Sequence, residues 1–339
     1  MFYIKPDFYD NFKCIAGSCT DNCCIGWEID VDEASLEKYN KINTPFGDKI
    51  RSQIIKSEDG SSCFKLSENE RCPFLNENNL CDIIINCGEE CLCDICREHP
   101  RFYEWFAGFT ECGLGLCCEE VCRILLKNEE PFSLTEESDG EEIVLETKED
   151  AAESYLYIFL SAFREKLFEI LFNETVGFEE KIVKILSKTE EFCGTEIKIR
   201  NYEKSIALYK KTEPIDDNWT AFIEALDKEC QNILKFEKEF QKKTKGDMLY
   251  SKLLAYIIYR HFIKAVFDRS IMERICFAVE SVRFIYLCDM KTYFENGELT
   301  LTDRINNLKN WSKQIEYSEE NTELLIYGEE LWQSRIKQT

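Results

Sequence analysis

Cysteine is concentrated in one part of this chain. Fifteen of the 19 cysteines lie between Cys14 and Cys122, and the other four are scattered through the rest of the 339 residues. A thiolate is a soft ligand that binds iron or zinc strongly. In a reducing compartment, such a density of thiols is typical of metal binding or redox chemistry. We interpret the four scattered cysteines as core residues, because buried thiols pack like small apolar groups.

The chain is expected to be cytoplasmic, where disulfides do not persist. Its first residues, MFYIKPDFYDNFKC, lack the basic segment and apolar run of a signal peptide. The most apolar later segment, residues 249–267, contains Lys252, Arg260, His261 and Lys264. Four such groups argue against a membrane span.

The spacing of the cysteines favours an iron–sulfur cluster, of the [4Fe–4S] type, over zinc. They form four groups: Cys14, Cys19, Cys23 and Cys24; Cys63, Cys72 and Cys81; Cys87, Cys91, Cys93 and Cys96; and Cys112, Cys117, Cys118 and Cys122. A standard zinc ribbon needs two CxxC pairs. Only Cys93 and Cys96 have that spacing, and the chain has only two histidines. Zinc and metal-free redox thiols remain alternatives.

Common catalytic motifs are missing from the sequence. Cys19 and Cys23 begin the CxxxCxxC pattern of radical S-adenosylmethionine enzymes, but its third position is Gly26. The sequence contains no GxGxxG and no P-loop. His99, beside a candidate ligand, is interpreted as a hydrogen-bonded neighbour of the cluster, with a proton-relay role as the alternative. Arg260 is either a structural ion-pair partner or a site residue.

The chain is strongly acidic, with a formal net charge of −23. Such a surface repels the phosphates of nucleic acids, so we expect no nucleic-acid partner. It would suit a lysine-rich protein partner, although the acidity can also serve solubility alone.

Sequence patterns predict a mainly α fold in three parts. Residues 1–127 form an irregular cysteine-rich metal domain, residues 128–153 an acidic connector, and residues 154–339 an α-helical domain. Apolar residues spaced three and four apart predict helices in the second half. These cover residues 149–172, 217–242, 247–267, 270–294, 302–316 and 319–335, within a bundle of five to seven helices. Thr147 and Asp150 have the spacing of a capping box at the first of these helices.

Several segments together resemble the flagellin lysine-N-methylase family. They are FKCIAGSCTDNCCIGW, RCPFLNENNLCDI, LCDICREHPRFYEWF and CEEVCRILL, followed by YSKLLAYIIYRHFIKAVFD and WSKQIEYSEEN. The resemblance covers nearly the whole chain. Its CPFL…C…CR core is shared with a broader group of zinc- or iron-chelating proteins. The chain departs from the family pattern at LCCEEVC, where Cys117 and Glu119 replace an expected serine and proline.

This resemblance implies an enzyme that transfers methyl groups from S-adenosylmethionine to lysine side chains of flagellin and that carries an iron–sulfur cluster. The implied metal ligands are Cys19, Cys23, Cys72, Cys81, Cys93 and Cys96. Cys14, Cys24 and Cys118 are further candidates. The sequence identifies neither the catalytic base nor the S-adenosylmethionine pocket. The alternative is a non-catalytic iron–sulfur or zinc module that serves as an electron carrier or a scaffold.

Overall fold

A computed structural model describes residues 1–57, 60–127, 130–140, 143–244 and 247–336, with side chains described up to residue 328. The chain forms two compact units. The helical unit comprises Met1–Asn11, Tyr103–Cys117 and Val121–Thr339. The cysteine unit comprises Phe12–Phe102 and Cys118–Glu120. This division differs from the predicted boundaries at residues 127 and 153, because the first eleven residues and residues 103–117 contribute to the helical unit.

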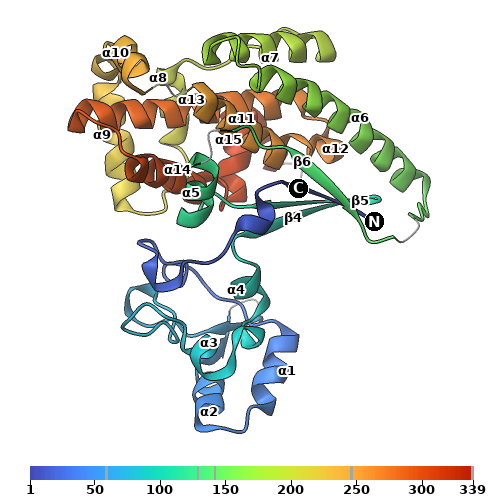
Figure 1. Cartoon of the computed structure of the whole chain (residues 1–339), viewed down its shortest axis with the longest axis vertical. Helices are drawn as coiled ribbons and strands as arrows, with labels where there is room; N and C mark the ends of the chain where they lie inside the picture. The colour runs from blue at the N-terminus through green and yellow to red at the C-terminus, as the bar shows by residue number, and fades with distance from the viewer. Residues whose placement is uncertain (58–59, 128–129, 141–142, 245–246, 337–339) are drawn as a thin grey trace. The chain divides into compact units, whose positions relative to one another are not determined.

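The predicted mainly α fold is confirmed, and a small sheet accompanies it (Figure 1). The cysteine unit contains α1 (Glu33–Lys41), α2 (Pro45–Ser52), α3 (Asp82–Cys87), α4 (Asp94–Glu98), β2 (Ile54–Lys56) and β3 (Ser62–Phe64). Helix α5 (Glu119–Lys127) begins in this unit and continues into the other. The helical unit contains α6 (Lys148–Leu171), α7 (Phe178–Cys193), α8 (Tyr202–Tyr209), α9 (Asp217–Leu234), α10 (Glu237–Thr244), α11 (Asp247–Phe262), α12 (Ala265–Asp268), α13 (Ile271–Asn296), α14 (Leu301–Ile315) and α15 (Glu319–Ile336).

Helix α13 is the centre of the helical unit. It packs against α7, α8, α9, α10, α11, α14 and α15 (Figure 1). Most of its residues from Arg274 to Lys291 are buried. Helix α11 is buried almost throughout, as its apolar sequence predicts. No helix within the described residues is long and apolar enough to cross a membrane.

The helical unit has more helices than the sequence suggests. Ten helices lie between residues 148 and 336 of the described chain, rather than five to seven. The predicted helix 217–242 is broken between α9 and α10, and the predicted helix 247–267 is broken between α11 and α12. Helices α7 and α8 were missing from the prediction. The capping box at Thr147 and Asp150 is confirmed, since each side chain accepts a hydrogen bond from the other residue's backbone N–H.

A four-stranded sheet, which the sequence analysis did not predict, covers part of the helical unit. Its strands run in the order β4 (Arg101–Phe106), β5 (Phe109–Leu114), β1 (Phe2–Pro6) and β6 (Leu134–Ser138). Strand β1 is parallel to β5 and antiparallel to β6. The buried Tyr259 hydroxyl lies 2.8 Å from the carbonyl oxygens of Ile4 and Cys112, and so ties α11 to both β1 and β5. Residues 134–138 of the predicted acidic connector thus belong to a sheet.

A buried ion pair joins this sheet to α6. Glu111 of β5 and Arg164 of α6 are each 1% exposed. The guanidinium binds both carboxylate oxygens, at 2.8 Å and 2.7 Å, and the Tyr157 hydroxyl donates to the same carboxylate at 2.8 Å. Coulombic attraction and hydrogen bonding by Glu111 outweigh burial and raise the pKa of Arg164. Both charges are therefore compensated inside the unit.

Breaking this ion pair is expected to destabilise the protein strongly. Arg164→Met leaves the Glu111 carboxylate buried without its cation, which should lower the free energy of unfolding by about 3–5 kcal/mol. Urea denaturation at neutral pH measures the change. The matched control is Lys184→Met, which removes an exposed pair with Glu180 on α7 and should change stability by no more than about 0.5 kcal/mol. Equal losses in the two variants would contradict the prediction.

Candidate metal centre

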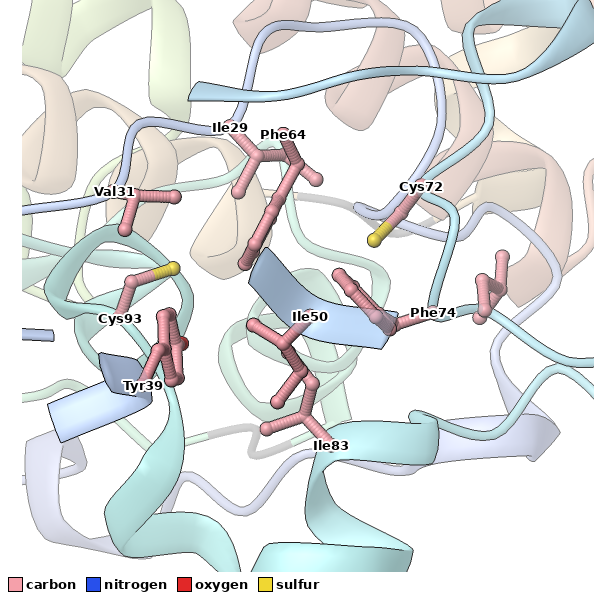
Figure 2. Close-up of a cluster of buried hydrophobic side chains, with 10 residues drawn as sticks. Ile29, Val31, Tyr39, Ile50, Phe64, Cys72, Phe74, Ile83 and Cys93 are labelled. Carbon is pink, nitrogen blue, oxygen red and sulfur yellow. The ribbon is translucent and has the colours of Figure 1, made fainter. Parts of the chain in front are cut away.

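The core of the cysteine unit is an apolar cluster that includes thiols. Its buried members are Ile29, Val31, Tyr39, Ile50, Phe64, Cys72, Phe74, Leu75, Ile83 and Cys93. Figure 2 shows the sulfur atoms of Cys72 and Cys93 turned inward, toward the rings of this cluster. Cys24, Cys81 and Cys96 are partly buried against it. Folding of this unit therefore places several thiols in an environment of low polarity.

Five thiols from distant parts of the sequence approach one another here. The Cys93 and Cys96 sulfurs lie 3.5 Å apart. Cys24 and Cys72 are close enough to Cys96 to raise its pKa. Cys81 likewise raises the pKa of Cys24 and of Cys72. We call the thiols of Cys24, Cys72, Cys81, Cys93 and Cys96, which act electrostatically on one another, the thiol cluster.

Local backbone structure positions each member of the thiol cluster. The backbone N–H of Cys72 donates to the Cys24 carbonyl at 2.8 Å, which holds these two segments together. Cys81 precedes α3 and Cys93 precedes α4, each as the N-cap residue. Cys96 lies on α4, one turn after Cys93, so the CxxC spacing brings the two sulfurs to the same side.

Backbone N–H groups point at three of the sulfurs. They come from Phe74 and Leu75 toward Cys72, from Ile83 and Ile84 toward Cys81, and from Cys96 toward Cys93. Such hydrogen bonds favour the charged thiolate over the neutral thiol. The backbone is thus arranged to accept negative charge on these atoms.

Burial opposes that charge. It raises the pKa of Cys72 to about 11 and also raises the pKa of Cys81. The hydrogen bond with Cys93 and burial raise the pKa of Cys96, whereas the same hydrogen bond lowers the pKa of Cys93. Neighbouring thiolates would repel one another in this pocket, so the five groups cannot all ionise unless a cation compensates them.

The predicted ligand Cys23 adjoins the thiol cluster through its hydrogen bond with Cys24, and the predicted ligand Cys19 lies four residues earlier in the same segment. Cys19 lies beside Glu119, whose carboxylate is 3.7 Å from the thiol and also binds the backbone N–H and hydroxyl of Thr20. Cys23 is exposed and accepts a hydrogen bond from the Cys24 thiol. Cys24, a further candidate from the family resemblance, is partly buried against the apolar core.

The remaining cysteines lie apart from the thiol cluster or serve packing. The thiols of Cys87 and Cys91 are hydrogen-bonded to each other. In the helical unit, the Cys117 thiol donates to the Tyr317 hydroxyl at 2.8 Å and the Cys122 thiol donates to the Leu116 carbonyl at 2.9 Å. Cys230 and Cys288 are buried and Cys193 and Cys276 half-buried, all four in helices.

The predicted metal site of the cysteine-rich region is not confirmed by the structure. Among the described residues, no three Cys, His, Asp or Glu side chains are placed so that they could hold a metal ion. With metal–sulfur bonds of about 2.3 Å, one tetrahedral ion needs four sulfurs all roughly 3.8 Å apart. Cys93 and Cys96 meet that distance, but no third thiol completes the set. A [4Fe–4S] cluster holds one cysteine at each iron and therefore tolerates more widely spaced sulfurs.

A second group of buried titratable residues lies in the helical unit, around Glu316. The fully buried Glu316 carboxylate is 3.3 Å from Arg260 Nη1 and 3.0 Å from His261 Nε2, and it accepts a hydrogen bond from the Ser312 hydroxyl. Arg260 also donates to the Tyr256 hydroxyl at 2.9 Å. Of the two interpretations of Arg260, the structure shows the ion pair.

Comparison with known proteins finds relatives among bacterial lysine-N-methylases. The chain is 28% identical over 142 residues to the lysine-N-methylases of Salmonella choleraesuis and Salmonella typhimurium, which is 40% of this chain and 35% of each relative. It is 29% identical over 140 residues to the flagellar biosynthetic protein FliU of Salmonella muenchen, which is 39% of this chain and 81% of that protein.

This finding confirms the family resemblance suggested by the sequence, over about 40% of the chain rather than nearly all of it. The match spans about a third of the length of the two lysine-N-methylases. No family model matches the chain, and no solved structure matches it. The relationship therefore rests on sequence identity with these curated proteins.

The Glu316 group predicts a pH dependence of stability. Burial lowers the pKa of His261 to about 4, despite the nearby carboxylate. In the unfolded chain this imidazole titrates near 6.5. Between pH 6.5 and 4 the unfolded state therefore binds a proton that the folded state does not, so stability falls as the pH falls, by up to about 3 kcal/mol.

This pH dependence can be tested by measuring the urea concentration at the midpoint of unfolding at pH 7, 6, 5 and 4, in the parent protein and in the variant His261→Gln. Glutamine keeps a hydrogen-bond donor near Glu316. The variant should lose less stability than the parent across this window. Parallel pH profiles for the two proteins would show that His261 does not carry the effect.

Proposed function

We propose that this chain is a protein-lysine N-methyltransferase that transfers methyl groups from S-adenosylmethionine to lysine side chains of flagellin. We further propose that its cysteine unit holds an iron–sulfur cluster on the thiol cluster. The observation that carries the activity is the identity with proteins named lysine-N-methylase. The name of the third relative, a flagellar biosynthetic protein, supports flagellin as the substrate. The convergence of five thiols supports the metal group.

The thiol cluster suits an iron–sulfur group for two reasons. Four irons need one thiolate each, and five thiols are available. Backbone N–H groups already point at the sulfurs of Cys72, Cys81 and Cys93. When bound, the cluster supplies the positive charge that keeps the thiolates ionised, and a redox-active centre. Cys24, Cys72, Cys81, Cys93 and Cys96 are the residues that would hold it.

Methylation requires a lysine amine that has lost its proton. Its nitrogen lone pair then attacks the methyl carbon of the sulfonium, a C–N bond forms, the C–S bond breaks, and S-adenosylhomocysteine leaves. Holding the amine and the methyl group in line lowers the barrier to this step. The net charge of −23 would attract a lysine-bearing protein to the enzyme and so raise the rate of encounter.

The metal proposal predicts a coloured protein whose colour depends on the thiol cluster. Protein purified without oxygen should contain iron and sulfide and absorb in the visible range. Cys72→Ser or Cys96→Ser should lose most of the iron, because serine is a poor ligand for it. Cys24→Ser should lose more iron than Cys19→Ser, since Cys24 lies in the thiol cluster.

The matched control for these variants is Cys230→Ser, which replaces a buried cysteine of α9 and should keep the full iron content. Circular dichroism of each variant checks that the helices remain. A colourless protein that contains zinc and no iron would contradict the proposed cluster and favour a zinc scaffold.

The activity proposal predicts methylated flagellin. Purified protein, S-adenosylmethionine and flagellin should yield S-adenosylhomocysteine, together with flagellin whose intact mass rises in steps of one methylene group. Omitting S-adenosylmethionine should abolish both signals. Tandem mass spectrometry should place the added groups on lysine side chains.

Unmodified flagellin in the presence of cluster-loaded protein would contradict the activity. Reversible bleaching of the cluster by a reductant, without methyl transfer, would instead favour the electron-carrier alternative. Measuring iron content and methylation on the same sample separates failure of the metal proposal from failure of the activity proposal.

A further inference from the structure

Helix α6 exposes an apolar face that the chain covers only in part, through the contact of Phe159 with Phe192 of α7, whose ring centroids lie 5.3 Å apart. Tyr155, Ile158 and Phe159 are 72%, 54% and 48% exposed. The other exposed positions between residues 151 and 162 are alanines, at 151, 152 and 162. No charged residue is exposed over these three turns, although 32% of the chain is charged.

This face lies opposite the one that packs into the helical unit. The residues of α6 that enter the core include Tyr157, Leu160, Phe163 and Leu167. The helix therefore has two apolar faces, one buried in the core and one that remains largely exposed. The Tyr155 and Phe159 rings stack on each other, with centroids 6.5 Å apart, so they form a continuous surface. A continuous exposed apolar face of this kind is typical of an interaction site.

We propose that this face binds the same face of a second copy of the chain, in an antiparallel helix pair. The pattern is self-complementary about a two-fold axis that passes between Ile158 and Phe159. Around this axis, Tyr155 of each copy lies over the small Ala162 of its partner, and Ile158 packs against Phe159. A two-fold interface requires such pairing of unlike positions within one surface.

Charges at the two ends of the face fit the same register. Lys148 and Glu169 are both exposed and lie on the side of α6 that carries Tyr155. The two-fold axis brings Lys148 of each copy to Glu169 of the other, which gives two ion pairs per dimer. Neither side chain has an ion-pair partner elsewhere in the described chain. Lys166 is also exposed on this side and, in the same register, lies over Ala151 of the partner copy.

The length of the paired helices indicates how tightly two copies should associate. Residues 148–169 span about 33 Å of helix at 1.5 Å per residue. At a crossing angle of about 20° the helices stay close over this length, so the end charges can meet. A single pair of helices buries less surface than a standard stable interface. The dimer is therefore weak, reversible and dependent on concentration. This inference is independent of the proposed function, because its readout is the oligomeric state.

The first test compares Ile158→Glu with Ile215→Glu. Glutamate is a good helix former, so Ile158→Glu should leave α6 intact while placing two like charges at the dimer axis. Sedimentation equilibrium over a range of concentrations should show a dissociation constant at least about tenfold higher than that of the parent. Ile215, 44% exposed in the loop before α9, is the matched control and should leave dimerisation unchanged.

The second test exchanges the end charges. Lys148→Glu and Glu169→Lys should each weaken self-association about fivefold, because each creates two like-charge contacts. An equimolar mixture of these two variants should form heterodimers, since both end contacts become attractive again. The double variant Lys148→Glu/Glu169→Lys should regain the parent's dissociation constant.

Two outcomes would overturn the proposal. One is a parent protein that stays monomeric at every concentration, which would leave the face to another partner, such as a lysine-bearing substrate. The other is a dimer that persists unchanged in Ile158→Glu, which would place the interface on a different surface.

Discussion

Repulsion between buried thiolates limits how many thiols of the cysteine unit can be ionised at the same time. Cys72 and Cys93 are members of its apolar core and also belong to the thiol cluster, so the core and the candidate metal centre are one structure. Burial raises the pKa of Cys72 and Cys81, while backbone N–H groups directed at their sulfurs favour ionisation. A bound cation would resolve this opposition, and metal binding would then be coupled to proton release and to folding.

In the helical unit, by contrast, two buried carboxylates are paired with cationic side chains of the same chain. Glu111 binds Arg164 and the Tyr157 hydroxyl, and Glu316 binds Arg260 and His261. In both groups the carboxylate is inaccessible to solvent and its partners come from helices that enclose it. These groups fix how helices and sheet pack together. Each of these two carboxylates therefore has its compensating cation within the chain.

Short-range patterns in the sequence predicted the features that are decided locally. The capping box at Thr147 starts α6 where expected, and apolar periodicity located α13 and α14. Breaks such as the one between α9 and α10 were missed, because the apolar spacing continues across them. The four-stranded sheet was missed because its pairing is non-local: Phe2 pairs with Phe109 on one side and with Ser138 on the other. Strands of five or six residues carry little periodic signal of their own.

The sequence by itself determined that this chain is mainly helical, acidic and rich in thiols, and its motifs revealed the relationship to lysine-N-methylases. It also placed Cys72, Cys81, Cys93 and Cys96 among the candidate ligands. Only the tertiary structure decided which thiols meet. It packed Cys24 against the apolar core and left Cys23 exposed, because the direction of a side chain depends on how the backbone packs against Cys72. The spacing of cysteines along the chain does not predict the direction in which each side chain points.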